Sequence, residues 1–300
     1  MHEAFLIQHV LEGFPLKVTC AEPCAGAFTG EAGGAQVLLG CADKDGGGAL
    51  LAAGPDPSGS PSPARVGGAP LEACPKFQVL SFHKKFSKAP ILQLTVVTAA
   101  MVGTYNVVEP PGLLLVLPAG GAIAVHALPD LALLHTLAGT KGCTGYAWDG
   151  GRSILAVALQ RRLVFYHYDG REWYEIKELS LPNTARQLAW CGTWALCVAT
   201  KKEYLVVNAN SGALLPVFPV GRAGPTCPPL ALRPAPPGGD GSLHVLRDNV
   251  GVVVGLDGKP LGGGDAAVTW SEPPSAVVAA GPFLLAVLSQ HVEARSTCCA

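Results

Sequence analysis

A pattern that recurs about every 41 residues constrains this chain more than any other feature. In each copy an apolar stretch leads through a short polar or glycine-containing turn into a second apolar stretch. Five copies begin with valines spaced by 41, 41, 47 and 42 residues: Val116, Val157, Val198, Val245 and Val287. An earlier, stretched copy begins at Val37. One copy alone cannot bury both of its faces, so the copies are expected to stack on one another.

Each copy predicts a β-hairpin. The first stretch is continuously apolar, as in 154–159, which suits a strand buried on both faces. The second stretch is rich in Leu, Val, Tyr and Phe, the residues that fit a pleated surface. A further turn at Asp169-Gly170 then leads to a more polar outer strand, expected at 172–179.

Several short strands in a period near 40 residues are typical of a propeller blade. A helical solenoid has similar periods, but its helices would have to cross the polar turns and the Gly/Pro clusters. The sequence therefore predicts an all-β fold, a β-propeller built from four-stranded antiparallel blades.

The 79 residues between Val37 and Val116 are close to two periods and leave two alternatives, a degenerate blade or expanded loops. We favour blade-edge strands around 77–82 and 91–97 together with loop expansion, because Gly/Pro/Ser-rich runs surround them. Flexible loop insertions are expected at about 42–75 and 223–241.

Composition excludes several classes of function. The charged fraction is 14% and the formal net charge is −1, so no global basic field exists to hold nucleic acid. The start of the chain lacks a basic segment followed by an apolar run, which argues against a secretory signal. The longest apolar stretch, 276–288, is interrupted by glycine and proline and is too short to cross a bilayer. We expect a soluble, cytoplasmic protein.

No motif indicates catalysis, a cofactor or a metal. The chain has 10 cysteines but no Cys-x-x-Cys pair, which favours free buried thiols over disulfides or a metal site. The glycine runs lack a phosphate-binding pattern, and no nucleophile elbow occurs. Turn residues are predicted where aspartate precedes glycine, at Asp149, Asp169, Asp240 and Asp257. Four histidines fall near strand ends without ligand spacing: His126, His167, His244 and His291. We therefore expect no enzyme activity and no cofactor.

The five tryptophans, at positions 148, 173, 190, 194 and 270, are spread over four repeats. This spread favours packing between blades over a single aromatic binding box.

Clustered cations supply the candidates for partner contacts. His83, Lys84, Lys85 and Lys88 form a basic cluster, for which a solvated loop and a contact with an acidic protein or a membrane headgroup are the alternatives. Further candidates lie in two predicted hairpin turns: Arg161, Arg162, Lys201 and Lys202.

A series of short motifs resembles one family. The start MHEAF, with LEGFPL soon after, is similar to the start of the vacuolar protein sorting thirty-nine or Vam-six-like subunit of the HOPS tethering complex. The resemblance continues in order with KFSK, TKG, VALQRRLVFYHYDGREW, LAWC, KKEYLVV, FPVG, VTW and AVLSQHVEAR. The region resembled is the citron-homology (CNH) domain of that family, a propeller.

The resemblance implies a non-enzymatic, protein-binding role. Members of this family act in tethering late endosomes and autophagosomes to vacuoles or lysosomes before membrane fusion. The implied partners are other tethering subunits and a small GTPase of the Rab type, with peripheral membrane association through the complex. The implied location is the cytoplasm, on late-endosomal and vacuolar membranes.

The resemblance also implies more blades than the hairpins account for. Six hairpins fit a seven-bladed propeller with about six blades present. We therefore expect residues 1–300 to form a single CNH-type domain that is truncated near its C-terminus, with 4–11 as its closing strand.

Three alternatives remain open. The chain could instead match the CORVET-type relative, described as TGF-beta receptor-associated. It could also be a CNH domain of a kinase or Rho regulatory protein. A propeller hydrolase would require acidic or histidine side chains that converge on the propeller axis.

Overall fold

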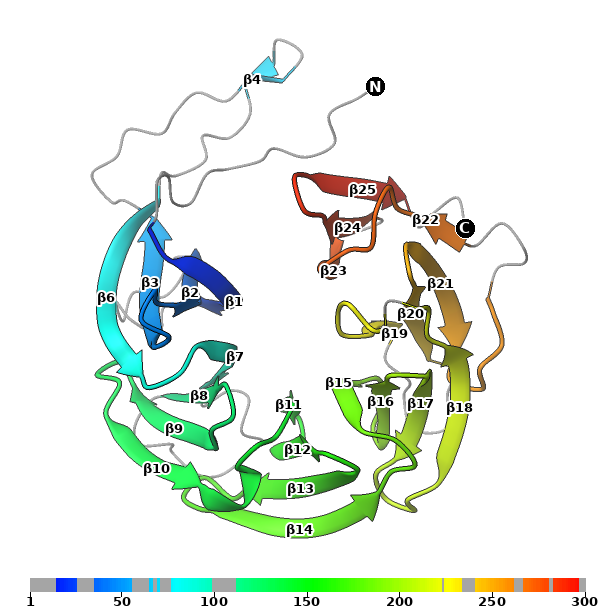
Figure 1. The fold of residues 1–300 in the computed structure, drawn as a ribbon, viewed down its shortest axis with the longest axis horizontal. Helices are drawn as coiled ribbons and strands as arrows, with labels where there is room; N and C mark the ends of the chain where they lie inside the picture. Colours follow the sequence, from blue (N-terminus) through cyan, green and yellow to red (C-terminus); the bar gives the residue numbers. More distant parts are fainter. Residues whose placement is uncertain are drawn as a thin grey trace. The chain divides into compact units, whose positions relative to one another are not determined.

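The computed structural model describes ten segments of the chain: 15–25, 35–55, 65–66, 69–70, 77–98, 112–222, 224–233, 241–261, 267–280 and 283–296. These segments belong to two compact units, the first ending at Gly142 and the second beginning at Cys143. Each unit is built from antiparallel sheets, which Figure 1 shows as successive groups of arrows. No helix among these segments is long and apolar enough to cross a membrane.

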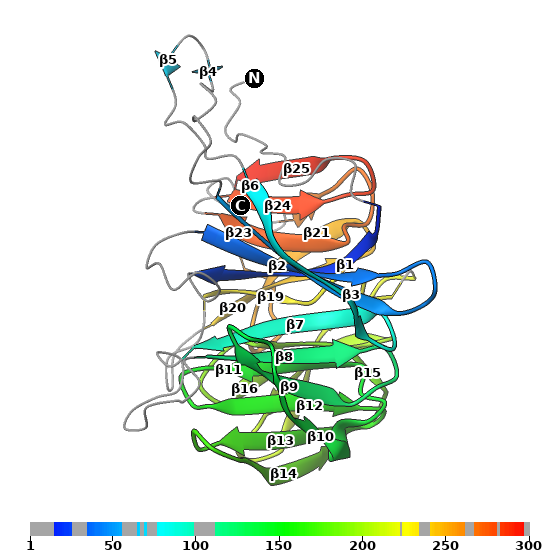
Figure 2. The ribbon, with the colours of Figure 1, turned by 90° about the vertical axis from the view of Figure 1, so that its left-hand side faces the viewer.

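The first unit contains two four-stranded sheets. The first sheet has the order β1 (Lys17–Ala25), β2 (Ala35–Ala42), β3 (Gly48–Pro55), β6 (Phe77–Ser87). The second has the order β7 (Ile91–Thr98), β8 (Gly112–Pro118), β9 (Ile123–Leu128), β10 (Leu133–Leu137). Figure 2 shows strands of both sheets from the side. A short pair, β4 (Arg65–Val66) and β5 (Ala69–Pro70), lies between β3 and β6 in the sequence.

Four sheets of the second unit are described. Three have four strands: β11 (Gly145–Asp149), β12 (Ile154–Leu159), β13 (Arg162–Tyr168), β14 (Trp173–Ser180); β15 (Ala185–Trp190), β16 (Ala195–Thr200), β17 (Glu203–Asn208), β18 (Leu214–Pro219); β19 (Leu230–Arg233), β20 (Ser242–Arg247), β21 (Val250–Gly255), β22 (Ala267–Thr269). The fourth has three described strands: β23 (Ala276–Ala280), β24 (Phe283–Val287), β25 (Val292–Ser296).

All six predicted hairpins are present, as β2–β3, β8–β9, β12–β13, β16–β17, β20–β21 and β24–β25. The continuously apolar first strand is buried along its length, as the six residues of β12 show. The outer strand β14 is largely exposed, which explains its more polar sequence. The all-β interpretation and the four-stranded antiparallel blade are therefore confirmed.

Neighbouring sheets within each unit pack through shared apolar clusters. In the first unit Leu38 and Leu50 pack with Leu94 and Leu114 of the next sheet. In the second unit Phe165 of β13 belongs to a cluster that continues into β15, β16 and β17. The first strands of successive sheets also contact one another, as β11 contacts β15 and β15 contacts β19. Burying such side chains on both faces of a sheet is what makes the repeat stable, at about 1.5–3 kcal/mol for each large aliphatic residue.

Between Val37 and Val116, the described strands complete the first sheet and begin the second, and they form no further four-stranded sheet of their own. β6 completes the first sheet and β7 begins the second, as the favoured interpretation expected. β6 also runs through His83 to Ser87, so the solvated-loop alternative for the basic cluster is wrong over most of its length. Strands also lie inside the expected insertions, β3 within 42–75 and β19 within 223–241. The expected closing strand at 4–11 lies outside the described residues.

Candidate partner-binding site

The basic cluster of the first unit lies on β6 and the turn that follows it. Gly48 pairs with Ser87, whereas Leu50 pairs with His83, so β6 carries extra residues in this interval and bulges. Lys85 takes up the bulge with a φ of 59°, a left-handed backbone conformation that is uncommon for side chains other than Asn, Asp and Gly. Lys84, Lys85 and Lys88 are exposed, whereas His83 is half-buried with its ring centroid 6.2 Å from that of Phe86.

The four candidates of the second unit lie in two neighbouring hairpin turns. Arg161 and Arg162 follow β12, and Lys201 and Lys202 follow β16; all four side chains are exposed. The Ala185 amide donates to the Gln160 carbonyl (3.1 Å), and Ala185 also pairs with Thr200. The first residue of β15 therefore joins the two turns at one end of their sheets.

The same arrangement continues into the next sheets. The Leu181 amide donates to the Arg161 carbonyl (2.7 Å), the Val220 amide to the Lys202 carbonyl (2.9 Å) and the Trp270 amide to the Asn249 carbonyl (2.9 Å). Each bond fixes a connector between sheets against a hairpin turn. We call the four turns 160–162, 201–203, 247–249 and 289–291, with their connectors, the turn arc.

Over its first three turns the turn arc is strongly cationic. It contains seven exposed Lys or Arg side chains: Arg161, Arg162, Arg186, Lys201, Lys202, Arg222 and Arg247. Arg162 pairs with Glu178 (2.9 Å), but both partners are exposed and such a pair contributes little stability. None of the other six forms an ion pair with another residue among those that the structure describes.

Sequence reasoning missed three of these cations, Arg186, Arg222 and Arg247. Arg247 could have been found from the repeat, since it follows the lead valine Val245 in the hairpin turn that corresponds to those of Arg161 and Lys201. Arg186 and Arg222 lie beside connectors whose lengths differ between repeats. Only the hydrogen bonds between connector and turn place them beside the other cations.

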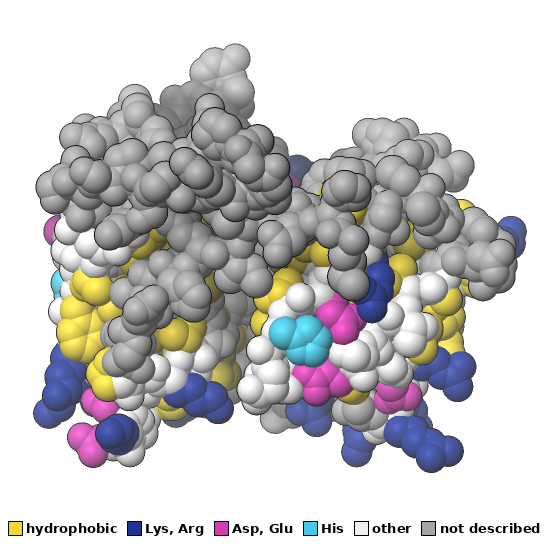
Figure 3. All heavy atoms as spheres, turned by 90° about the horizontal axis from the view of Figure 1, so that it is seen from above, with side chains coloured by type: hydrophobic (Ala, Val, Ile, Leu, Met, Phe, Trp, Pro, Cys, Tyr) yellow, Lys and Arg dark blue, Asp and Glu magenta, His cyan; other side chains and the backbone are white. Residues whose placement is uncertain are grey.

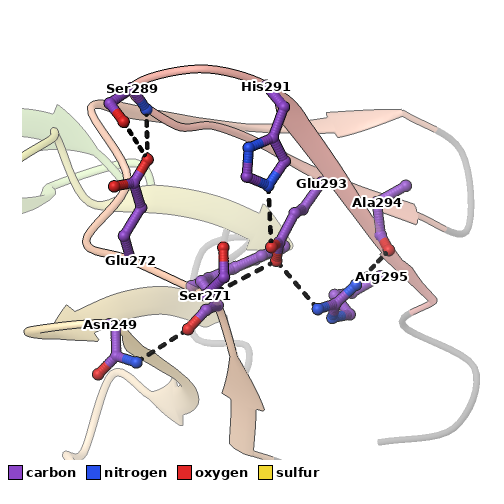
Figure 4. A network of polar contacts seen from close by, with 9 residues as sticks. Asn249, Ser271, Glu272, Ser289, His291, Glu293, Ala294 and Arg295 are labelled. Atoms are coloured by element: carbon purple, nitrogen blue, oxygen red, sulfur yellow. Dashed lines mark hydrogen bonds and ion pairs between the residues drawn. The ribbon is translucent and has the colours of Figure 1, made fainter.

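The fourth turn of the turn arc has the opposite character (Figure 4). Glu272 accepts hydrogen bonds from the amide and the hydroxyl of Ser289, both at 2.6 Å. Glu293 accepts from the Ser271 amide (3.4 Å) and from Arg295 (2.9 Å), and its other oxygen lies 3.3 Å from His291 Nε2. The Ser289 hydroxyl lowers the pKa of Glu272, and the bond to Ser271 lowers the pKa of Glu293. Both carboxylates therefore stay ionised at neutral pH. Figure 3 shows, in its right half, a histidine with carboxylates beside it.

The opposite ends of two sheets in the second unit carry tryptophan side chains in two sets of contacts. The Arg152 guanidinium carbon lies 4.5 Å from the Trp190 ring centroid and 4.6 Å from that of Trp194. Trp148 and Trp173 contact each other edge to face at 5.6 Å. Trp190 also packs between sheets, since its Nε1 donates to the Ala147 carbonyl (3.1 Å) and its ring centroid lies 6.2 Å from that of Phe165, as the expectation of packing between blades requires. The fifth, Trp270, is buried in the core as expected.

The predicted turn aspartates are confirmed where they are described. Asp149, Asp169 and Asp257 each accept a hydrogen bond from a backbone amide two residues later, at 2.9, 2.8 and 3.0 Å. Asp240 lies outside the described residues. Among the described residues, no three His, Cys, Asp or Glu side chains are placed to hold a metal ion.

Two histidines are buried rather than solvent-facing. His126 Nδ1 lies 2.9 Å from the Leu131 carbonyl, so this histidine is satisfied. His244 is almost fully buried, and its Nε2 has no hydrogen-bond partner. Burial lowers the pKa of His244 to about 4, so its imidazole is neutral at physiological pH.

Comparison with known proteins identifies the family. The model of the CNH domain matches residues 96–298. The chain belongs to the CNH domain family. Among solved structures, the AfRom2 CNH domain resembles this CNH chain with a TM-score of 0.58 at 15% identity, over 96% of this chain and 84% of that one. The WD40 repeats of RRP9 give a TM-score of 0.61 at 13% identity, over 96% and 78% of the two chains. These likenesses show the β-propeller fold.

Two curated relatives are similar to the CNH chain over most of its length. "Vacuolar sorting protein 39" of Arabidopsis thaliana is 33% identical over 211 residues, which is 70% of this chain. "Vam6/Vps39-like protein" of Homo sapiens is 27% identical over 308 residues, which is 99% of this chain. The matches span only 19% and 30% of these longer relatives. The family expected from the short motifs is confirmed.

Proposed function

We propose that this CNH propeller is a protein-binding part of a vacuolar sorting tethering subunit of the HOPS type, and that it has no enzymatic activity. The observation that carries the proposal is similarity to a "Vam6/Vps39-like protein" over 99% of the chain. The proposed role is the tethering of late endosomes and autophagosomes to vacuoles or lysosomes, with peripheral attachment to those membranes from the cytoplasmic side. Residues 1–300 act as one propeller domain in this proposal.

The state of the cysteine thiols supports a role without nucleophilic chemistry. All seven described cysteines are free, and six of them are buried. Burial raises the pKa of Cys143 to about 11 and that of Cys191 and Cys227 to about 12. A thiol with such a pKa is protonated at neutral pH and is a poor nucleophile.

The proposed contact with a small GTPase of the Rab type uses the turn arc. Its cations are exposed, are held by hydrogen-bonded turns, and mostly lack a described ion-pair partner. Such charges are available to an acidic partner surface and accelerate its association. The basic cluster on β6 is a second proposed contact within the first unit.

A pull-down with a late-endosomal Rab GTPase tests this function. We expect the GTP-loaded form to be enriched over the GDP-loaded form. Lys201→Glu with Lys202→Glu should weaken binding at least tenfold, because it reverses two exposed charges in the centre of the turn arc. The matched control is Arg171→Glu with Lys259→Glu, which makes the same charge change in turns at the other ends of the sheets and should leave binding within about twofold. Equal capture of both nucleotide forms would contradict the GTPase contact.

A further inference from the structure

The charges of the turn arc are arranged in order rather than mixed. The first three turns expose seven cations, whereas Glu178, Glu203 and Asp248 are the carboxylates placed among them. The last turn carries Glu272 and Glu293, with Arg295 and His291 beside them. The second unit therefore presents a surface that is positive over three sheets. At the last turn Glu293 is paired with Arg295 (2.9 Å) and its side chain is only 12% exposed, whereas Glu272 forms no ion pair among the described residues.

This order is fixed by the backbone. Thr200 Oγ1 accepts from the amides of Lys202 (3.2 Å) and Glu203 (3.1 Å) and so holds the second turn. Asn249 Nδ2 donates to the Trp270 carbonyl (2.8 Å), and the Trp270 amide donates to the Asn249 carbonyl. The last two turns are joined in this way, and the spacing of their charges is held before any partner arrives.

Close contact also joins the second and third turns. A Cβ placed on Gly221 would lie 2.3 Å from the carboxylate of Asp248. The connector that follows β18 therefore passes directly against the next hairpin turn. The charges from Arg161 to Glu293 thus belong to one continuous surface of the second unit.

We propose that the turn arc is a polarised docking surface for a folded protein or peptide that carries an acidic stretch followed by a basic residue. This proposal rests on the proposed protein-binding function and specifies the chemistry of the partner. A partner with that order of charge meets the seven cations with its acidic stretch and Glu272 with its basic residue, since Glu293 is already paired with Arg295. The polarity also fixes the direction in which the partner lies along the turns.

The acidic turn distinguishes a protein partner from an anionic membrane. A membrane surface presents negative charge everywhere, so it attracts the first three turns but repels ionised Glu272 and Glu293. Only a partner with both signs of charge is complementary to the whole turn arc. We therefore favour a protein partner over a lipid surface.

Two synthetic peptides test the inference without the GTPase. One consists of glutamates, and the other is identical except that the residues at one end are lysines. Fluorescence anisotropy at low salt gives the ratio of their affinities for the wild-type chain and for Glu272→Gln with Glu293→Gln. The glutamine variant keeps side-chain oxygens that can accept from Ser289 and Ser271, and a thermal melt shows whether it folds as the wild type does.

We expect neutralisation to shift the ratio by at least about threefold toward the all-glutamate peptide. We also expect Lys201→Glu with Lys202→Glu to abolish binding of both peptides. An unchanged ratio would overturn the inference. Undiminished peptide binding by the protein variant Lys201→Glu with Lys202→Glu would also overturn it. If the glutamine variant does not fold, Glu272→Gln alone replaces it, and it should shift the ratio in the same direction.

Vesicles containing phosphatidylserine provide the competing outcome. Wild-type binding to these vesicles that exceeds binding to both peptides would overturn the inference in favour of a membrane. The result is also separable from the proposed function. GTPase capture with an unchanged peptide ratio rejects only the polarised surface, whereas a shifted ratio without GTPase capture rejects only the GTPase contact.

Discussion

At the scale of single residues, Glu22 shows how burial sets chemistry in this fold. Its carboxylate accepts the Val96 amide at 3.2 Å across from the first sheet to the second. Desolvation nevertheless raises its pKa to about 7, because the hydrogen bond only partly offsets the loss of water. A carboxyl group that titrates near neutrality makes the stability of the first unit depend on pH.

Replacing Glu22 with glutamine should remove that dependence. The folded pKa of about 7 lies above the usual value of 4.5, so the folded state binds the proton more tightly. The stabilisation is complete below the usual value and is lost as pH rises through about 7. At about pH 8.5 we expect Glu22→Gln to be more stable than the wild type by on the order of 2 kcal/mol, with the difference shrinking toward pH 5. Urea unfolding at both pH values measures this, and an equal difference at the two would contradict it.

At the scale of elements, the hairpin is the unit in which sequence and packing agree. The period predicted six hairpins because a strand buried on both faces must be apolar throughout. That requirement can be recognised in the amino-acid sequence alone. The observed strand boundaries differ from the predicted ones where contacts between strands extend a strand. The outer strand β6 extends to Ser87 through a bulge at Lys85, which no local pattern marked.

Gly251 of β21 illustrates a packing requirement inside a hairpin. A Cβ at this position would lie 2.1 Å from Nε2 of the buried His244 on the paired strand β20. We expect Gly251→Ala to destabilise the second unit by about 2–3 kcal/mol, because a buried ring has to move within a packed core. Thermal unfolding followed by calorimetry measures the loss.

The control for this substitution is Gly151→Ala. Its Cβ would meet only the Asp149 carboxylate, at 3.4 Å. This change should alter the free energy of unfolding by no more than about 0.5 kcal/mol. Similar losses for the two variants would show that glycine flexibility, rather than the contact with His244, controls the effect.

At the scale of the whole molecule, the distribution of charge matters more than its sum. The formal net charge is only −1, yet seven cations lie along one surface of the second unit. Composition alone therefore excluded a global basic field correctly and gave no sign of a local one. Long-range attraction from exposed charges of this kind is screened by salt within about 10 Å at 0.1 M.

Association with the proposed partner, a Rab GTPase, should therefore slow as salt rises. Between about 50 and 500 mM NaCl we expect the association rate to fall by roughly tenfold, with a smaller change in the dissociation rate. Stopped-flow fluorescence measures both rates. Lys201→Glu with Lys202→Glu should flatten the salt dependence, whereas Arg171→Glu with Lys259→Glu should leave it as in the wild type. A salt-independent association rate would argue against the turn arc as the contact.

The sequence by itself determined the class of fold and the six hairpins, because a repeat of buried strands leaves a periodic apolar pattern along the chain. Its short motifs, by their resemblance to a known family, indicated the family. It also pointed to cations in two hairpin turns. Only the tertiary structure decided that these turns join Arg186, Arg222 and Arg247 in one surface and that Glu272 lies against the last turn. It likewise placed Trp190 and Trp194 against Arg152 and Trp148 against Trp173. The physical reason is that hydrogen bonds and contacts between distant parts of the chain set these neighbours, and such contacts leave no local trace in the sequence.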